Sequence, residues 1–314
     1  MNRREFIRNA TGISGAAIAP AIAGGLEPAH AAAPPARVAL VKTRDRAAGV
    51  ARAIDLLSPN RFGGRDVFVK PNLNSADPAP GSTHPDTLAA MMRKLAALGA
   101  GPLTVGDRSG MGDTRDVMVK TQVFRIAKDL GAKAVVFDEL GADDWELIEL
   151  PQSHWAQGFA LPRMVRTAGA VVQTCCLKTH RYGGHFTLSL KNSVGLAAKR
   201  VPGNPHDFMR ELHSSPQQRR MIAEINAAYR PALVVLAGTD RVAIDAVGVA
   251  LLRHFGTTPE VSRGKIFAQE QIARAVELGL GVAGPGAIEL VTADRDSADY
   301  AKRIRAILDG APGA

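Results

Sequence analysis

Short apolar runs rich in β-branched residues alternate with longer amphipathic stretches along most of the chain. The short runs predict buried strands of a parallel sheet, at residues 38–42, 66–70, 103–105, 134–137, 170–177, 233–236 and 288–291. The longer stretches predict helices, at residues 47–57, 86–98, 116–130, 162–168, 217–228, 243–255, 269–278 and 298–308. This order predicts an α/β fold, layered, with a largely parallel sheet and helices on both faces.

Two segments interrupt the alternation. Residues 141–159 contain both tryptophans in a weak pattern, which indicates a short hairpin or a lid. Residues 196–216 combine Gly, Pro and His with several basic residues, which predicts a long basic excursion at the surface. About 280 residues can bury a full core as one large domain or as two smaller lobes, and we expect residues 32–314 to form a single domain.

The most unusual chemistry lies in residues 171–195, which read VVQTCCLKTHRYGGHFTLSLKNSVG. A predicted strand opens this stretch, and Lys178, His180, His185, Lys191 and Asn192 follow it. In open α/β sheets, ligands bind beyond the carboxyl ends of the strands. This stretch therefore lies where a ligand is expected.

Polar residues also follow other predicted strands: Lys70 and Asn72, then Asp107, then Asp240. The carboxyl ends of parallel strands share one edge of a sheet, so these side chains are expected to converge. Lys70 has no obvious capping role, whereas Asp107 could instead be a turn or cap residue. His84 precedes a helix N-terminus, where anions bind, although an ordinary loop histidine fits equally well.

Positive charge is concentrated around the same stretch. The chain has 39 Lys and Arg residues against 30 Asp and Glu, a net charge of +9. Residues 163–220 alone hold ten basic and two acidic residues, with four of the eight histidines. We therefore expect Lys70, Lys178 and Lys191 to line one anion-binding pocket, with Lys199 outside it. The alternative is a solvated basic face.

The two cysteines are neighbours, Cys175 and Cys176, and are poor disulfide partners for each other. Either one thiol faces the site while the other packs in the core, or both are buried and inert. Cys176, His180 and His185 gather at one strand end. Since thiolate and imidazole suit zinc, copper or iron, they form a candidate transition-metal site, the alternative being three unrelated residues.

The N-terminus has the pattern of an export signal. Arg3 and Arg4 precede a weakly apolar run at residues 10–26, and small residues near Ala31 resemble a cleavage site. The arginine pair resembles a twin-arginine signal, whose machinery exports folded cargo. We expect residues 1–31 to be removed and the protein to be periplasmic, without a stable membrane span. Nucleic acid is excluded as a partner by export and by an aromatic content of only 5%.

Six short motifs occur in a characteristic order. They are ValLysProAsnLeu at 69–73, ThrHisPro at 83–85, ValGlyAsp at 105–107, CysLeuLysThrHis at 176–180, LeuLysAsn at 190–192 and ThrAspArgValAlaIleAspAla at 239–246. Together they resemble the domain-of-unknown-function family 362, over most of residues 38–290. The resemblance implies an uncharacterised α/β protein, some relatives of which are fused to ferredoxin-like iron–sulfur modules. Two cysteines cannot ligate an ordinary cluster, so such a cluster would belong to a ferredoxin-like partner chain.

The chain departs from the family pattern at one place. Relatives carry a longer Gly-rich stretch between the strand matching residues 233–236 and the segment matching residues 239–245. Here the segment between Leu236 and Asp240 is short, which leaves the completeness of the site open. Asp240 and Asp245 still match the family pattern as ligand-binding candidates, with capping or bracing as the alternative for Asp245.

Two function classes follow from these observations. The first is an exported enzyme acting on an anionic substrate or cofactor. Its catalytic candidates are His180, Lys178 and Asp107, and its ligand-binding candidates are Lys70, Asn72, His84, Lys191, Asn192, Asp240 and Asp245. The second class is a non-catalytic periplasmic binding or maturation protein for an anionic or metal-containing ligand.

Overall fold

The computed structural model describes residues 34–57, 62–181, 183–235 and 237–313. Pro35–Ala314 forms one compact unit. The expected signal peptide at residues 1–31 lies outside the described residues, as does Leu236. Among the described helices, none is both long and apolar enough to cross a bilayer.

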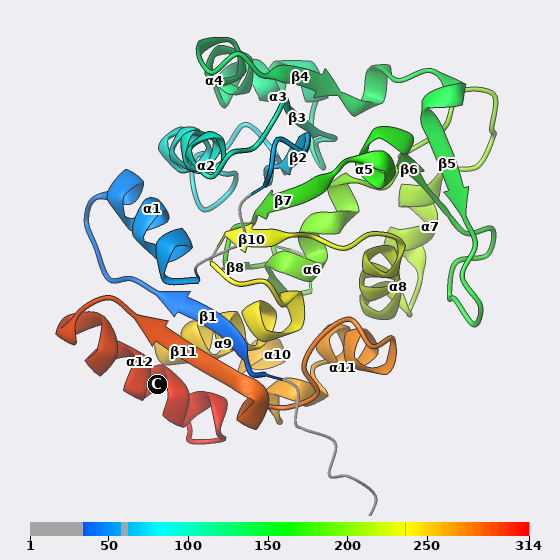
Figure 1. The fold of residues 1–314 in the computed structure, drawn as a ribbon. Helices are drawn as coiled ribbons and strands as arrows, with labels where there is room; N and C mark the ends of the chain where they lie inside the picture. The colour runs from blue at the N-terminus through cyan, green and yellow to red at the C-terminus, as the bar shows by residue number, and fades with distance from the viewer. Residues whose placement is uncertain (1–33, 58–61, 182, 236, 314) are drawn as a thin grey trace, which may run out of the picture. The chain divides into compact units, whose positions relative to one another are not determined.

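Five parallel strands form the central sheet, in the order β10–β7–β2–β3–β4 (Figure 1). They are β2 (Val67–Lys70), β3 (Leu103–Asp107), β4 (Lys133–Val136), β7 (Ala170–Thr174) and β10 (Leu233–Val235). A parallel pair, β1 (Ala36–Leu40) and β11 (Ile288–Thr292), follows the β10 edge, where the Ala39 N–H donates to the Ala237 carbonyl at 2.8 Å. The parallel pairing confirms the predicted fold class.

Successive side chains along each strand point to opposite faces of the sheet, so the core has two layers. Val67 and Val69 of β2 pack with α1 (Arg46–Leu57) and α2 (Pro85–Ala97), and with α3 (Thr114–Lys120) and α4 (Val123–Asp129). Phe68 between them packs on the opposite face. That face is covered by α5 (Arg163–Thr167), α7 (Phe208–Ser214) and α8 (Gln218–Ile225). Helices therefore cover both faces of the sheet, as predicted.

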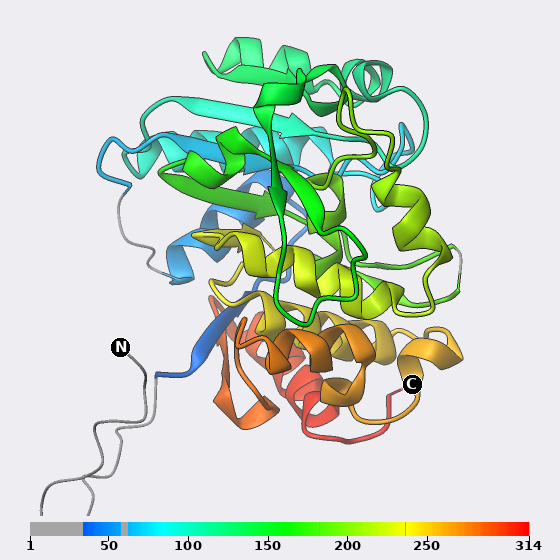
Figure 2. The ribbon, with the colours of Figure 1, turned by 90° about the vertical axis from the view of Figure 1, so that its right-hand side faces the viewer.

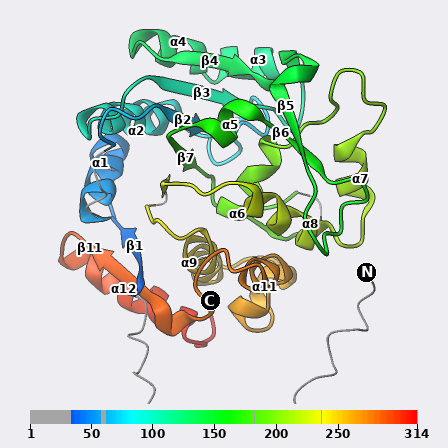
Figure 3. The same ribbon diagram turned by 45° about the vertical axis from the view of Figure 1, so that its right-hand side comes forward.

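A third apolar cluster surrounds β1 and β11. It contains α9 (Arg241–His254), α10 (Pro259–Ser262), α11 (Glu270–Glu277) and α12 (Arg295–Leu308). Figure 3 shows α9, α11 and α12 at the end of the strand array opposite to β4. The helix α9 is buried along most of its length, which explains its nearly unbroken apolar sequence.

Three segments differ in detail from the prediction. The helix predicted over residues 116–130 is two helices, broken where Gln122 adopts a left-handed backbone with φ of 64°. Residues 141–159 contribute to an antiparallel hairpin of β5 (Trp145–Ile148) and β6 (Phe159–Pro162), on the same side as α7 and α8 (Figure 2). The predicted surface excursion at residues 196–216 is only partly right, because residues 196–198 are buried and Phe208 of α7 packs fully buried in the core. Exposed residues lie between these buried positions and again after α7.

The strand order fixes where a crevice forms. From β2 the chain proceeds through β3 to β4 on one side, then returns to place β7 and β10 on the other side of β2. The direction of winding thus reverses between β2 and β7. A crevice opens outside the carboxyl ends of the strands at such a switch point.

Candidate functional site

A cavity of about 1050 Å³ lies at this switch point. Its wall comes from the residues after β2, β3 and β7 and from α7 and α8. It is strongly cationic: the basic residues of the wall are Lys70, Arg108, Lys178, Arg181, Lys191, Lys199, Arg210 and Arg219, and the acidic ones are Asp77, Asp107 and Asp207.

Most of the predicted site residues meet at this cavity. Those on its wall are Lys70, Asn72, Asp107, Lys178, His180, His185, Lys191 and Asn192. Four predicted residues are absent from the wall, namely His84, Cys176, Asp240 and Asp245. Lys199, expected outside the pocket, lines it as well, so that expectation is wrong.

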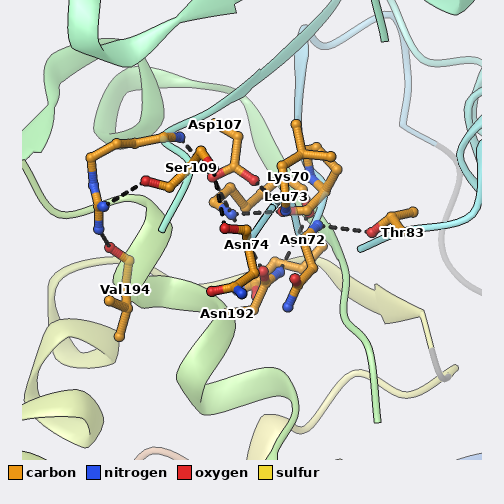
Figure 4. A network of polar contacts seen from close by, with 12 residues as sticks. Lys70, Asn72, Leu73, Asn74, Thr83, Asp107, Ser109, Asn192 and Val194 are labelled. Carbon is orange, nitrogen blue, oxygen red and sulfur yellow. Dashed lines mark hydrogen bonds and ion pairs between the residues drawn. The ribbon is translucent and has the colours of Figure 1, made fainter. Parts of the chain in front are cut away.

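Lys70 is already paired inside the protein (Figure 4). Its Nζ lies 2.7 Å from Oδ1 of Asp107, and both side chains are 1% exposed. The same Nζ donates to the Pro71 carbonyl at 2.6 Å and to Oδ1 of Asn192 at 3.3 Å. Burial lowers the pKa of Lys70 and raises the pKa of Asp107. Whether the proton lies on the Lys70 amine or on the Asp107 carboxyl group, the pair has no net charge.

Asp107 and Asn192 tie the loops of the site to the sheet. The carboxylate of Asp107 accepts from the N–H groups of Leu73 at 2.9 Å and Arg108 at 2.7 Å. The Asn192 amide donates to Oε1 of Gln173 on β7 at 3.2 Å. Gly195 is required beside them, because a Cβ there would lie 2.5 Å from Oδ1 of Asp107. These contacts hold the backbone of the site in place.

Asn192 ends the short helix α6 (Ser189–Asn192), whose start is held by Asp245. Oδ1 of Asp245 accepts from the Ser189 N–H at 2.7 Å and the Leu190 N–H at 3.3 Å. Oδ2 accepts from Nε2 of Gln271 at 3.1 Å. Burial raises the pKa of Asp245 to about 7, against the effect of these hydrogen bonds. The geometry thus corresponds to the bracing alternative for this residue.

Asp240 and His84 are helix caps. Oδ1 of Asp240 accepts from the N–H groups of Val242 and Ala243 at 2.8 Å, at the start of α9. Nδ1 of His84 accepts from the Asp86 N–H at 3.2 Å, at the start of α2. Both positions satisfy N–H groups that the first turn of a helix leaves without a partner.

Two cations of the wall form no ion pair with any described acidic side chain, although the charge of Glu270 acts on Arg219. Arg219 of α8 is 7% exposed, and its buried Nη1 has no hydrogen-bond partner among the described residues. Lys191 has neither a hydrogen bond nor an ion pair within the described part of the chain. Burial, followed by the charges of Arg219, Lys178 and Arg108, lowers the pKa of Lys191 to about 7. Burial likewise lowers the pKa of Arg219 to about 10.

Two further wall residues, Lys178 and His185, can take part in proton transfer. Lys178 opens β8 (Lys178–Thr179) and donates from Nζ to the Gly81 carbonyl, and burial lowers its pKa. β8 pairs with β9 (Phe186–Thr187), and the His180 N–H next to it donates to the His185 carbonyl at 2.6 Å. Burial and the charge of Arg219 lower the pKa of His185, so its ring is neutral near pH 7.

The cysteine thiols are enclosed. Cys175 and Cys176 are both buried, and burial raises both pKa values. In the described ranges, no three His, Cys, Asp or Glu side chains are arranged to hold a metal ion. A transition-metal site at Cys176, His180 and His185 therefore stays a prediction from the sequence. Two neighbouring cysteines do not fit a four-cysteine iron–sulfur cluster.

Arg108 and Arg219 were not singled out from the sequence. The sequence contained a signal for Arg108 as a site residue, because Arg108 directly follows Asp107 at the end of β3. For Arg219 the sequence contained no signal beyond the basic character of its region, since a charged residue on an amphipathic helix usually faces solvent.

Comparison with known proteins gives a family without an assigned activity. No curated protein matches the chain. Residues 67–239 match the family described as "Domain of unknown function (DUF362)", a range that runs from β2 through β10. More than half of the chain is matched, and the match includes every residue of the cavity wall. The chain therefore belongs to the domain-of-unknown-function family DUF362.

Proposed function

We propose that the protein is an enzyme whose cavity binds a small anionic substrate or cofactor, through a carboxylate or phosphate group. The observation that carries this proposal is a pair of cations on the cavity wall, Lys191 and Arg219, that form no ion pair within the described residues. A buried charge without a partner costs several kcal/mol, and an anion bound between two such cations removes that cost. Lys70 does not take part in this way, because Asp107 already neutralises it.

Titratable groups beside these cations favour an enzyme over a carrier. His180, His185 and His213 line the same cavity, and a neutral His185 can accept a proton from a bound substrate. Groups with shifted pKa values that meet in one cavity are typical of active sites. The second candidate, a non-catalytic binding or maturation protein for an anionic or metal-containing ligand, uses the same cations and predicts binding without turnover.

Thermal denaturation in the presence of phosphates and small carboxylates tests the binding step. A ligand at a hundredfold excess over its dissociation constant stabilises the fold by about 2.7 kcal/mol and raises the melting temperature. Arg219→Gln should abolish this rise. Arg220→Gln is the matched control, since the neighbouring Arg220 pairs with Glu277 and does not line the cavity. A rise that both variants keep, or that both lose equally, contradicts the proposal.

We also propose that the protein works outside the cytoplasm, after export through the twin-arginine route. Support comes from Arg3 and Arg4 ahead of a weakly apolar segment. If the reaction is redox-linked, its iron–sulfur cluster belongs to a ferredoxin-like partner chain, because this chain has two cysteines.

A further inference from the structure

We propose that Lys191 is a nucleophilic amine that forms an imine with an anionic aldehyde or ketone bound in the cavity. The proposal goes beyond anion binding, and it rests on the proposed function only for the anchoring of the anionic group. The geometric basis is that Lys191 lines the cavity, and its Nζ has no partner within the described part of the chain.

The backbone on both sides of Lys191 is anchored. Before it, the Leu190 N–H is held by the carboxylate of Asp245 at 3.3 Å. After it, Asn192 accepts from Lys70 and donates to Gln173, which ties α6 to the ends of β2 and β7. A side chain with a fixed backbone and an unbound amine is placed to attack a bound carbonyl carbon.

Burial, followed by the charges around Lys191, favours the neutral, nucleophilic form of its amine. Arg219 approaches from α8, Lys178 from β8 and Arg108 from the end of β3, and all three are cations. With a pKa of about 7, about half of the Lys191 amine is unprotonated at pH 7. An ordinary lysine, with a pKa near 10.5, is unprotonated in only about one molecule in 3,000. Neighbouring cations activate amines for imine formation in this way.

The other lysines of the cavity are less suited to the same role. Lys70 is bound by Asp107 and by two further acceptors. Lys178 donates to the Gly81 carbonyl. Lys199 is exposed to solvent. Among the lysines of the cavity wall, Lys191 therefore combines partial burial with an amine that has no partner among the described residues.

The same cations define the class of substrate. A carboxylate or phosphate held by Arg219 and Lys178 brings a carbonyl group of the same small molecule to Lys191, as in a 2-oxo acid. The Nζ lone pair adds to the carbonyl carbon, and one of the two amine protons moves to the carbonyl oxygen. This oxygen then leaves as water together with the second amine proton, which forms the C=N bond, and hydrolysis reverses the step without any oxidant or reductant. The protonated imine then withdraws electrons from the neighbouring carbon.

Reductive trapping on the full chain tests the proposal. The protein is treated at pH 7 with glyoxylate, an anionic aldehyde, and sodium cyanoborohydride, and modified lysines are located by mass spectrometry of peptides. Lys191 should be modified at least about tenfold faster than Lys199, as expected for an activated amine. Excess phosphate should slow this reaction. Lys191→Arg keeps a long basic side chain that cannot form the imine and should lose the rapid modification, whereas Lys120→Arg, at an exposed lysine outside the cavity wall, should keep it.

A neutral aldehyde of similar size, glycolaldehyde, separates this proposal from the proposed function. Preference for Lys191 should be at least about fivefold weaker with glycolaldehyde, because nothing anchors that molecule to the cations. If phosphate raises the melting temperature but Lys191 reacts no faster than Lys199, anion binding stands and the imine proposal is overturned. Fastest modification at Lys178 also overturns it. If Lys191 reacts fastest with both aldehydes alike, the nucleophile stands and the anionic class of substrate is overturned.

Discussion

Three lysines at one cavity differ in their chemistry because of their immediate neighbours. Lys70, Lys178 and Lys191 all follow strands or lie in the stretch after one, and strand position alone predicted that they would share a site. Position could not predict that Asp107, 37 residues after Lys70, would neutralise it. It also could not predict that the charge of Arg219, added to burial, would lower the pKa of Lys191. Those differences arise from distances that exist only in the folded chain.

The buried pair of Lys70 and Asp107 leads to a prediction about stability. Lys70→Met leaves a buried carboxylate without its cation, and removing one partner of such a pair costs about 3–5 kcal/mol. Asp107→Asn should be costly for the same reason. The double variant should lose less than the sum of the two, as measured by urea unfolding in a double-mutant cycle.

The exposed pair of Arg115 and Glu139 supplies the control cycle. Its side chains are 55% and 48% exposed and screened by solvent, so its coupling should be much weaker than that of the buried pair. If the effects of Lys70→Met and Asp107→Asn add within about 0.5 kcal/mol, the two side chains are not energetically coupled in the way their geometry indicates.

At the scale of elements, long helices and strands were predictable and short ones were not. The strands β2, β3 and β7 carry compact apolar runs, and α2 begins at Pro85 and is followed by Gly99, both recognisable boundary signals. The helix α6 has only four residues, too few for a periodic pattern. It is formed by tertiary contacts, with Asp245 at its start and Asn192 at its end. The element that carries Lys191 was therefore the one hardest to predict.

Asp245, which holds the start of α6, predicts a specific pH dependence of the stability of the fold. Burial raises the pKa of Asp245 from 3.8 to about 7, so the folded state binds this proton more tightly than the unfolded chain. The contribution of this bound proton to the free energy of unfolding is fully present below about pH 4 and is lost as the pH rises through 7. Asp245→Asn removes the titrating group and should flatten the stability profile between pH 4 and 8. Its amide can donate to Oε1 of Gln271, which lacks a partner among the described residues.

Urea unfolding at pH 5 and pH 8 measures this difference. Asp245→Ala provides the contrast, since it leaves the N–H groups of Ser189 and Leu190 without an acceptor. An unsatisfied buried group costs about 1–3 kcal/mol, so this variant should be less stable than wild type at both pH values. A profile for Asp245→Asn that runs parallel to that of wild type would refute the assigned titration.

At the scale of the whole molecule, the alternation of strands and helices sufficed for the fold class. The pattern gave the parallel sheet and its two helical layers because each buried strand and each amphipathic helix has its own period. It did not give the strand order, which depends on how the chain returns from β4 to the far side of β2. That return creates the switch point, and therefore the cavity, so the site depends on topology more than on any motif.

The whole chain is expected to fold in the cytoplasm before export. Cys175 and Cys176 are buried thiols that form no disulfide in the described fold, as suits a protein that folds in the reducing cytoplasm before export. The twin-arginine route transports folded cargo, so Arg3→Lys with Arg4→Lys should retain the precursor in the cytoplasm although the charge is unchanged. Cell fractionation and the size of the chain report the outcome. Arg8→Lys, a matched change in the same segment, should leave export intact. Appearance of the double variant outside the cytoplasm at the wild-type level would exclude this route.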